Sequence, residues 1–334
     1  MHRPAVALLV SIAFAIPSLS QTSPQKDKKK DIEQIGNRDI GKGINFYSIE
    51  KEIALGKQLA EEVQRQARMF NDPLIGEYVN RLCQSLARNS DARVPITCQV
   101  IDADDLNAFA LPGGFIFVHT GLVKVAETEA ELAGALSHEI AHVAARHMTR
   151  QATRSQLAQL LTLPTSLLIG GWTGYIVRQG TGVAIPMTFL KMDRAFESEA
   201  DFYGLQYMYK AGYDPTASVD LFERMLSLQK RKPGIINSVF STHPPNGERM
   251  RKTQEEINNI LPNKPEYVVN TSEYVAMRSR LFRLLSHRKN EEVDPNKPQL
   301  RQAPGAGTIP ADDGTQDRNK QDDRPTLKRR EWVE

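Results

Sequence analysis

The feature that most constrains this chain is the pattern HEIAH at residues 138–142, which falls inside a stretch that favours an α-helix. Thr128-Glu-Ala-Glu131 upstream fits a capping box, so we expect a helix to begin there and to run through ELAGALSHEIAHVAARHMTRQ. Residues four apart on a helix differ by only about 40° in direction, so the rings of His138 and His142 can both reach one metal ion. Glu139 is then placed to take a proton from a metal-bound water.

This pattern needs a third protein ligand before it indicates a metal site, because a match of this length arises by chance in about one chain in a hundred. The chain has seven histidines, and His147 is the first further candidate. On a continuous helix His147 points about 180° away from His138, so we expect it to make a structural hydrogen bond instead. Ala145 and Met148 stand where the class HExxHxxGxxH has glycine and histidine, which excludes that class.

An acidic pair downstream offers the missing ligand. The sequence from Ala195 to Lys210 favours a second helix that ends at Gly212. Glu197 and Asp201 lie four residues apart on it and therefore share one face. Glu197 can complete a His-His-Glu site whose fourth position stays open, while Asp201 can hold the free N–H of a ligating histidine. The alternative is a solvated acidic face, which the HEIAH pattern makes the weaker interpretation.

The chain before the HEIAH pattern favours one helix and a small sheet. Asp72-Pro73 supplies a cap and a first-turn proline, so we expect an amphipathic helix over 73–88. Alternating apolar residues predict a strand over 96–100. The segment 107–114 is rich in turn formers, and a second strand is expected over 115–118. The predicted class is therefore α+β and mostly α-helical, with a small sheet beside the HEIAH helix.

The two cysteines allow two interpretations. Cys83 flanks the apolar stripe of the first helix, and Cys98 lies on the apolar side of its strand. A disulfide between them would close a loop of about 15 residues and stabilise the fold by about 3 kcal/mol. Two buried thiols that act as small apolar side chains fit the sequence equally well. The pattern does not decide between them.

Composition and the two ends of the chain bound its organisation. Its 40% hydrophobic and 25% charged content is typical of a soluble globular protein, and a formal net charge of +3 argues against a nucleic-acid partner.

Residues 1–20 resemble a signal peptide cleaved near Ser20, which predicts export to the periplasm or beyond; an uncleaved anchor is the alternative. We expect a polar linker over 21–45, one domain over 46–288 and a disordered tail over 289–334.

Five segments together are similar to one family, the zinc metallopeptidases that include the CAAX prenyl proteases, the HtpX heat-shock proteases and the BepA-type periplasmic proteases. The segments are NAFALPGGFIFVHTGL at 107–122, HEIAHVAARH at 138–147, Arg194-x-x-Glu197-x-x-x-Asp201, AGYDP at 211–215 and STHPPNGERM at 241–250. They occur in the family's order and extend the resemblance over roughly residues 46–288. Five linked motifs are far more specific than HExxH alone.

The resemblance implies a gluzincin-type fold with one Zn2+ per chain, held by His138, His142 and Glu197, and with Glu139 as general base. It also implies that a strand near Asn107 binds an extended polypeptide as an added strand. The residues singled out for that strand are Asn107, Ala108, Phe109, Gly113 and Gly114.

Two more residues acquire expected roles from the resemblance. His243 matches a position from which a histidine can approach the zinc as an inhibitory fourth ligand, although it can also be an ordinary loop histidine. Arg249 either helps polarise the scissile carbonyl or braces that loop.

The chain also departs from its relatives. It has no 34-residue repeat of the kind that follows the protease domain in BepA-type proteins. Residues 155–177 carry no charge and favour a flap or buried helical hairpin beside the site, and peripheral contact with a membrane surface through residues 155–190 stays open. The expected substrates are unfolded or misassembled envelope proteins. The alternative function is a zinc-stabilised chaperone or binding module that holds envelope proteins without cutting them. The sequence does not determine the oligomeric state.

Overall fold

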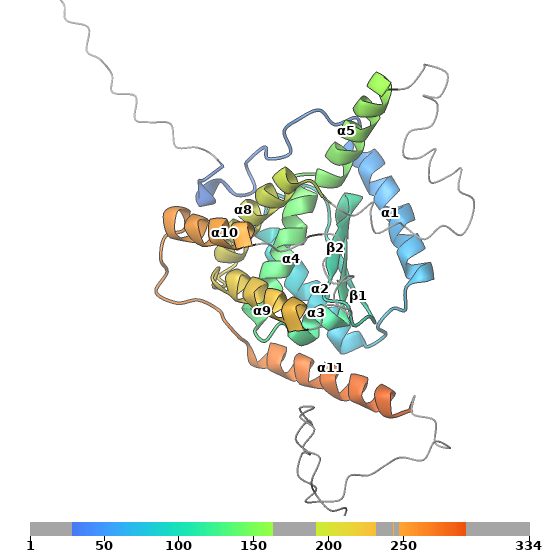
Figure 1. Ribbon diagram of the computed structural model, residues 1–334, viewed down its shortest axis with the longest axis vertical. Helices are drawn as coiled ribbons and strands as arrows, with labels where there is room; N and C mark the ends of the chain where they lie inside the picture. Colours follow the sequence, from blue (N-terminus) through green and yellow to red (C-terminus); the bar gives the residue numbers. More distant parts are fainter. Residues whose placement is uncertain (1–28, 163–191, 232–242, 244–246, 292–334) are drawn as a thin grey trace, which may run out of the picture. The chain divides into compact units, whose positions relative to one another are not determined.

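A three-stranded sheet and the helices on its two faces make up the part of the fold that carries the site (Figure 1). The computed structural model describes residues 29–162, 192–231, 243 and 247–291. Its elements are η1 Ile32–Gln34, α1 Ile49–Gln66, α2 Pro73–Arg88, β1 Thr97–Ile101, β2 Ala108–Leu111, η2 Pro112–Gly114, β3 Phe115–His119, α3 Thr120–Val125, α4 Glu129–Ala144, α5 His147–Thr162, α8 Arg194–Lys210, α9 Ala217–Arg231, α10 Gly247–Ile260 and α11 Ser272–Glu291. The described part is mostly helical with a small sheet, which confirms the predicted fold class.

The strands run in the order β1-β3-β2, with β1 parallel and β2 antiparallel to β3. The first half of the turn-rich segment 107–114 is therefore a strand, as the resemblance implied and the local turn formers did not. Phe109 pairs opposite Phe117, and Ala110 opposite Ile116. The turn signals come from Pro112–Gly114 alone, which form η2 between the two strands.

Both faces of the sheet are buried. Phe109 and Phe117 lie on one face and pack with Leu55 and Leu59 of α1. The opposite face packs against α2 and α4, and its side chains belong to the larger core cluster. Figure 1 shows α1 and α4 on opposite sides of the strands. Burial on both faces explains why these strands contain few polar side chains.

The beginnings of α2 and α4 follow from their caps. Asp72 Oδ1 accepts a hydrogen bond from the Ile75 amide at 3.1 Å, and α2 has the bounds that the sequence predicts. Thr128 Oγ1 accepts from the Glu131 amide at 3.2 Å. The Glu131 carboxylate in turn accepts from the amide of Glu127, one residue before the cap, at 2.8 Å. Both helices begin where side-chain oxygens satisfy free amides.

The long helix predicted to run through the HEIAH pattern is two helices, so its expected continuity was wrong. α4 ends at Ala144, and α5 begins at His147. Between them Arg146 has φ 56°, a left-handed conformation that ends a helix. The Arg146 guanidinium donates to Glu52 Oε2 at 2.6 Å and to the Tyr47 carbonyl at 2.7 Å. Contacts with the region of α1, which are remote in sequence, hold the break in place.

Helix α8 packs closely against α4. A Cβ atom on Gly204 would lie 3.0 Å from the His138 amide nitrogen, so glycine permits the close crossing. The helix ends before Gly212, which has φ 95° and is the expected stop. This crossing brings the acidic face of α8 toward the histidines of α4.

Cys83 on α2 and Cys98 on β1 form a disulfide bond. The sequence had allowed either this bond or two buried thiols. The bond joins a helix of the larger core to the sheet that packs on it.

Part of the segment expected to be a linker belongs to the fold. Ile35 and Ile40 are buried in the larger core. Arg38, only 4% exposed, donates to both carboxylate oxygens of Asp91 and to Gln206 Oε1. Residues 29–45 are therefore not a free linker, and the expected boundary at residue 46 was too late.

Several other expectations fall outside the described residues. These are the signal peptide over 1–20, most of the segment 155–190 and the tail expected over 289–334, except that residues 289–291 belong to α11 and not to a disordered tail. Across the described ranges, no helix combines the length and the hydropathy needed to cross a membrane.

Candidate metal centre

Two helices and one further segment bring four metal-binding side chains together. His138 and His142 come from α4, Glu197 from α8, and His243 from the segment before α10. One donor atom from each lies within 4.8 Å of the others. The structure therefore gathers the three expected ligands and the expected fourth histidine in one place.

The donor spacing fits a zinc ion. The Nε2 atoms of His138 and His142 are 3.0 Å apart. The His138 Nε2 atom lies 3.5 Å from Glu197 Oε2, and the His142 Nε2 atom lies 3.5 Å from Glu197 Oε1. Tetrahedral zinc with bonds of about 2.0–2.2 Å needs donors about 3.3–3.5 Å apart, so these distances require little adjustment. Two imidazoles and one carboxylate also match the ligand types that zinc prefers.

Asp201 occupies the position expected for a partner of the first ligand. His138 Nδ1 lies 2.9 Å from Asp201 Oδ1. Burial favours the neutral ring of His138, but hydrogen bonds and charge from Asp201 and Glu197 outweigh it and raise the pKa of His138 to about 10. The carboxylates of Asp201 and Glu197 therefore place negative charge beside this ring.

Arg249 binds the carboxylates of the site. Its Nε and Nη2 atoms donate to Asp201 at 2.8 Å and 2.7 Å, and its Nη1 atom lies 2.9 Å from Glu197 Oε2. A longer bond of 3.4 Å runs from Nη1 to the His243 carbonyl. This geometry matches the expected bracing role. Direct contact with a scissile carbonyl stays a prediction.

His142, the second expected ligand, contacts a different set of side chains from those that hold His138. His142 Nδ1 lies 2.9 Å from His147 Nδ1. His147 Nε2 lies 3.2 Å from Glu199 Oε2, and Arg150 Nη1 donates to the same oxygen at 3.1 Å. His147 thus makes a structural hydrogen bond, as expected, but its partner is the candidate metal ligand His142. Glu199 and Arg150 were not expected at the site, because the break at Arg146, which allows α5 to contact α8, has no local signature.

Glu139 lies beside the candidate ligands with only 3% of its surface exposed. Its Oε2 atom has no hydrogen-bond partner within the described part of the chain. Burial raises the pKa of this carboxyl, although the nearby histidines oppose the rise. A buried carboxylate with a free oxygen beside a cation site is suited to accept a proton from water.

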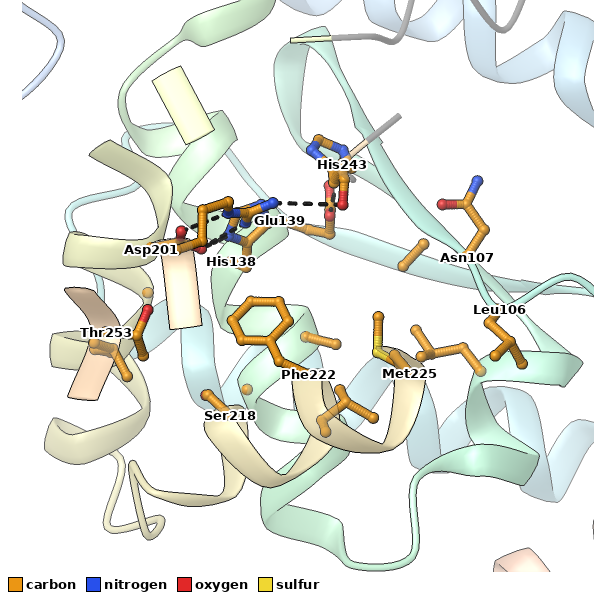
Figure 2. Close-up of a pocket in the computed structure, with 18 residues that line it drawn as sticks. Leu106, Asn107, His138, Glu139, Asp201, Ser218, Phe222, Met225, His243 and Thr253 are labelled. Atoms are coloured by element: carbon orange, nitrogen blue, oxygen red, sulfur yellow. Dashed lines mark hydrogen bonds and ion pairs between the residues drawn. The ribbon is translucent and has the colours of Figure 1, made fainter. Parts of the chain in front are cut away.

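His243 is held at the site by Glu197. Its Nδ1 atom lies 2.6 Å from Glu197 Oε1, and its Nε2 atom lies 3.6 Å from Glu139 Oε1. Figure 2 shows its ring close to Glu139 and His138. The fourth histidine therefore lies beside the three expected ligands, and its role as an inhibitory ligand stays a prediction.

A hollow with a mainly apolar lining adjoins His138 and Glu139. Phe222 and Met225 of α9 and Leu106 line it, and Asn107 lies at its edge (Figure 2). Ala108 at the start of β2 also lines the hollow. Two of the expected substrate-strand residues, Asn107 and Ala108, therefore border the site, whereas the Phe109 side chain packs into the core beneath α1.

Gly113 and Gly114, which were also expected in the substrate strand, lie in the turn between β2 and β3. Both lie in η2 with positive φ, 76° and 98°. A Cβ atom on Gly113 would lie 2.6 Å from Ile53 Cα, and one on Gly114 would lie 2.0 Å from the Pro95 carbonyl oxygen. These glycines allow the turn to pack against neighbouring backbone, so they do not form a strand edge for a substrate.

Comparison with known proteins gives the family. The model described as peptidase family M48 matches residues 73–257, more than half of the chain. A beta-barrel assembly-enhancing protease of Yersinia pestis is 27% identical over 81% of this chain and 56% of its own length. The protein of that name in Escherichia coli is 25% identical over 85% of this chain and 58% of its own length. A mitochondrial metalloendopeptidase OMA1 of Schizosaccharomyces pombe is 35% identical over 45% of this chain and 43% of its own length.

The chain thus spans little more than half the length of the bacterial relatives. The matched segment includes all four metal-binding side chains and agrees with the family expected from the five motifs. The chain belongs to peptidase family M48.

Proposed function

We propose that the chain is a zinc-dependent endopeptidase that hydrolyses peptide bonds. The observation that carries the proposal is the set His138, His142 and Glu197, whose donor atoms have the spacing of a zinc site with Glu139 alongside. A zinc ion bound there would act as a Lewis acid and would lower the pKa of water at the open position to about 7. Family membership and the similarity to known proteases support the same reaction class.

In this proposal Glu139 moves the proton. Its free Oε2 atom takes a proton from the water that attacks the scissile carbonyl, and later passes it to the leaving amine. Arg249 and Asp201 hold His138 and Glu197 in place during this transfer. Burial of Glu139 keeps competing solvent away from the carboxylate.

The substrate is proposed to be an extended polypeptide. Among the described strands, β2 pairs only with β3, so it lies at an edge of the sheet. A peptide added along β2 would be bound mainly through its backbone, which suits many sequences, while the apolar hollow could take one side chain. We also propose unfolded or misassembled envelope proteins as substrates and export as the localisation; the bacterial relatives, whose name refers to beta-barrel assembly, support proteins that assemble beta-barrels as the substrate class.

Digestion of casein tests the reaction. The full chain supplied with zinc should cut casein, and a chelator should abolish the cutting. Cutting that persists in the chelator would contradict the zinc dependence, and no cutting by either the wild type or His243→Ala would contradict the proposal.

His243 supports a second candidate function, a zinc-stabilised binding module that holds clients without cutting them. Its ring contacts both Glu197 and Glu139, so in this proposal it blocks the approach of water and substrate to these two side chains. If His243 is an inhibitory ligand, the variant His243→Ala cuts casein faster than the wild type. If neither protein cuts, the binding module becomes the better account.

A further inference from the structure

Each of the two candidate histidine ligands is held from behind by a chain of polar groups that ends at an arginine. For His138 the chain is short, because Asp201 contacts the ring directly and Arg249 binds Asp201. For His142 the neighbour is another imidazole, that of His147. We infer that His147 is a positioning residue, which orients His142 for the metal through a relay that continues to Glu199 and Arg150.

The positions of the protons in this relay follow from the chemistry of imidazole. His142 needs a free lone pair on Nε2 to bind a cation, so its proton lies on Nδ1 and must be donated to an acceptor. The facing Nδ1 atom of His147, 2.9 Å away, accepts it only if it is unprotonated. His147 therefore carries its own proton on Nε2, where Glu199 Oε2 accepts it at 3.2 Å. A single arrangement of protons satisfies every contact.

The surroundings of His147 fix its ring. The residue has no exposed surface, and its ring stacks on Phe196 with the centroids 4.5 Å apart and the planes at 25°. Arg150, which donates to Glu199, also lies over the Phe196 ring at 4.9 Å. A ring clamped in this way presents its lone pair to His142 in one direction only, which is what orienting a metal ligand requires.

The inference rests on the proposed zinc site but not on peptide hydrolysis, so the test measures metal binding. In the full chain, His147→Leu fills similar space without an acceptor, whereas His147→Asn offers its Oδ1 atom near the position of Nδ1. Competition with a chromophoric chelator gives the zinc affinity, and the visible spectrum of the cobalt-substituted protein reports the geometry at the metal. We expect His147→Leu to weaken zinc binding about 10- to 100-fold and to change the cobalt spectrum, with most of the loss recovered in His147→Asn.

Two further variants keep the test decisive. Val143→Ala is the control: it truncates a buried residue on the turn of α4 that carries His142. It should lower the thermal midpoint without weakening zinc binding. Glu199→Leu cuts the relay at a partly exposed position and decides the matter if His147→Leu does not fold.

The outcomes separate the inference from the proposed site. A folded His147→Leu variant with the zinc affinity and cobalt spectrum of the wild type would overturn the inference alone, as would equal losses in His147→Leu and His147→Asn. If His147→Leu does not fold, unchanged zinc binding by Glu199→Leu overturns it. A wild-type chain that binds no zinc overturns the proposed site and the inference together.

Discussion

Glu139 owes its expected reactivity to its position on α4. Its carboxylate is buried, and burial raises its pKa, so it holds a proton more readily than an exposed glutamate does. A general base that must accept a proton and then release it to a leaving amine works best with a pKa near the operating pH. Because the proposed zinc ligands are other side chains, the proton-transfer role of Glu139 can be removed without removing the metal.

The variant Glu139→Gln should keep one zinc per chain and lose about 10²- to 10⁴-fold in the rate of casein hydrolysis, because the amide cannot accept the proton. Zinc content and initial rate are measured on the same sample. Glu77→Gln, on the exposed face of α2, is the control and should cut at the wild-type rate. A Glu139→Gln variant that cuts as fast as the wild type would sink the mechanism.

The turn between α4 and α5 matters at the scale of elements, because it decides which side of α5 faces the metal centre. Arg146 adopts φ 56°, and its side chain contacts Glu52 on α1. The next residue is His147, so the position of that ring depends directly on the turn. A continuous helix would have turned His147 away from His138.

Two substitutions at Arg146 test the conformation of this turn. Arg146→Gly and Arg146→Ala both remove the contact with Glu52, so the difference between them reports the backbone. At a left-handed residue Gly should be more stable than Ala by about 1 kcal/mol, measured by urea unfolding. Within a continuous helix the order would reverse, with Ala more stable by about 1 kcal/mol. The reversed order would therefore contradict the break.

The same turn shows what the sequence could and could not predict. α2 and the start of α4 were predictable, because Asp72 and Thr128 are local caps whose partners lie within four residues. The break after α4 depends on Glu52 and Tyr47, far away in the sequence, so no local pattern reveals it.

The site shows the same division. The HEIAH spacing and the acidic pair on α8 identified its centre, because ligand positions on a helix follow from the period of the helix. The strand β2 was expected from the resemblance but not from its local sequence, and the relay through Glu199 was not expected at all, since both depend on packing between distant segments. The burial of Arg38 against Asp91, which draws the N-terminal segment into the fold, depends on distant contacts too.

At the scale of the whole molecule, the disulfide ties α2 to the sheet that lies beside the metal centre. It closes a loop of 15 residues in sequence separation, so in the chain-entropy model it should contribute about 3 kcal/mol. Unfolding of the same chain in urea, with and without a reductant, compares identical side chains. We expect the reduced protein to lose about 3 kcal/mol of unfolding free energy, and equal midpoints would show that the bond contributes nothing. The double variant Cys83→Ala/Cys98→Ala is the control and should not respond to the reductant.

The central claim is that one zinc ion is held by two helices, α4 and α8, through His138, His142 and Glu197. Anomalous diffraction from crystals of the full chain, recorded on both sides of the zinc absorption edge, tests it most directly. The account predicts one strong anomalous peak per chain, about 2.0–2.2 Å from both Nε2 atoms and from a Glu197 oxygen. A zinc-supplied crystal with no peak there, or with its peak at other side chains, would contradict the account.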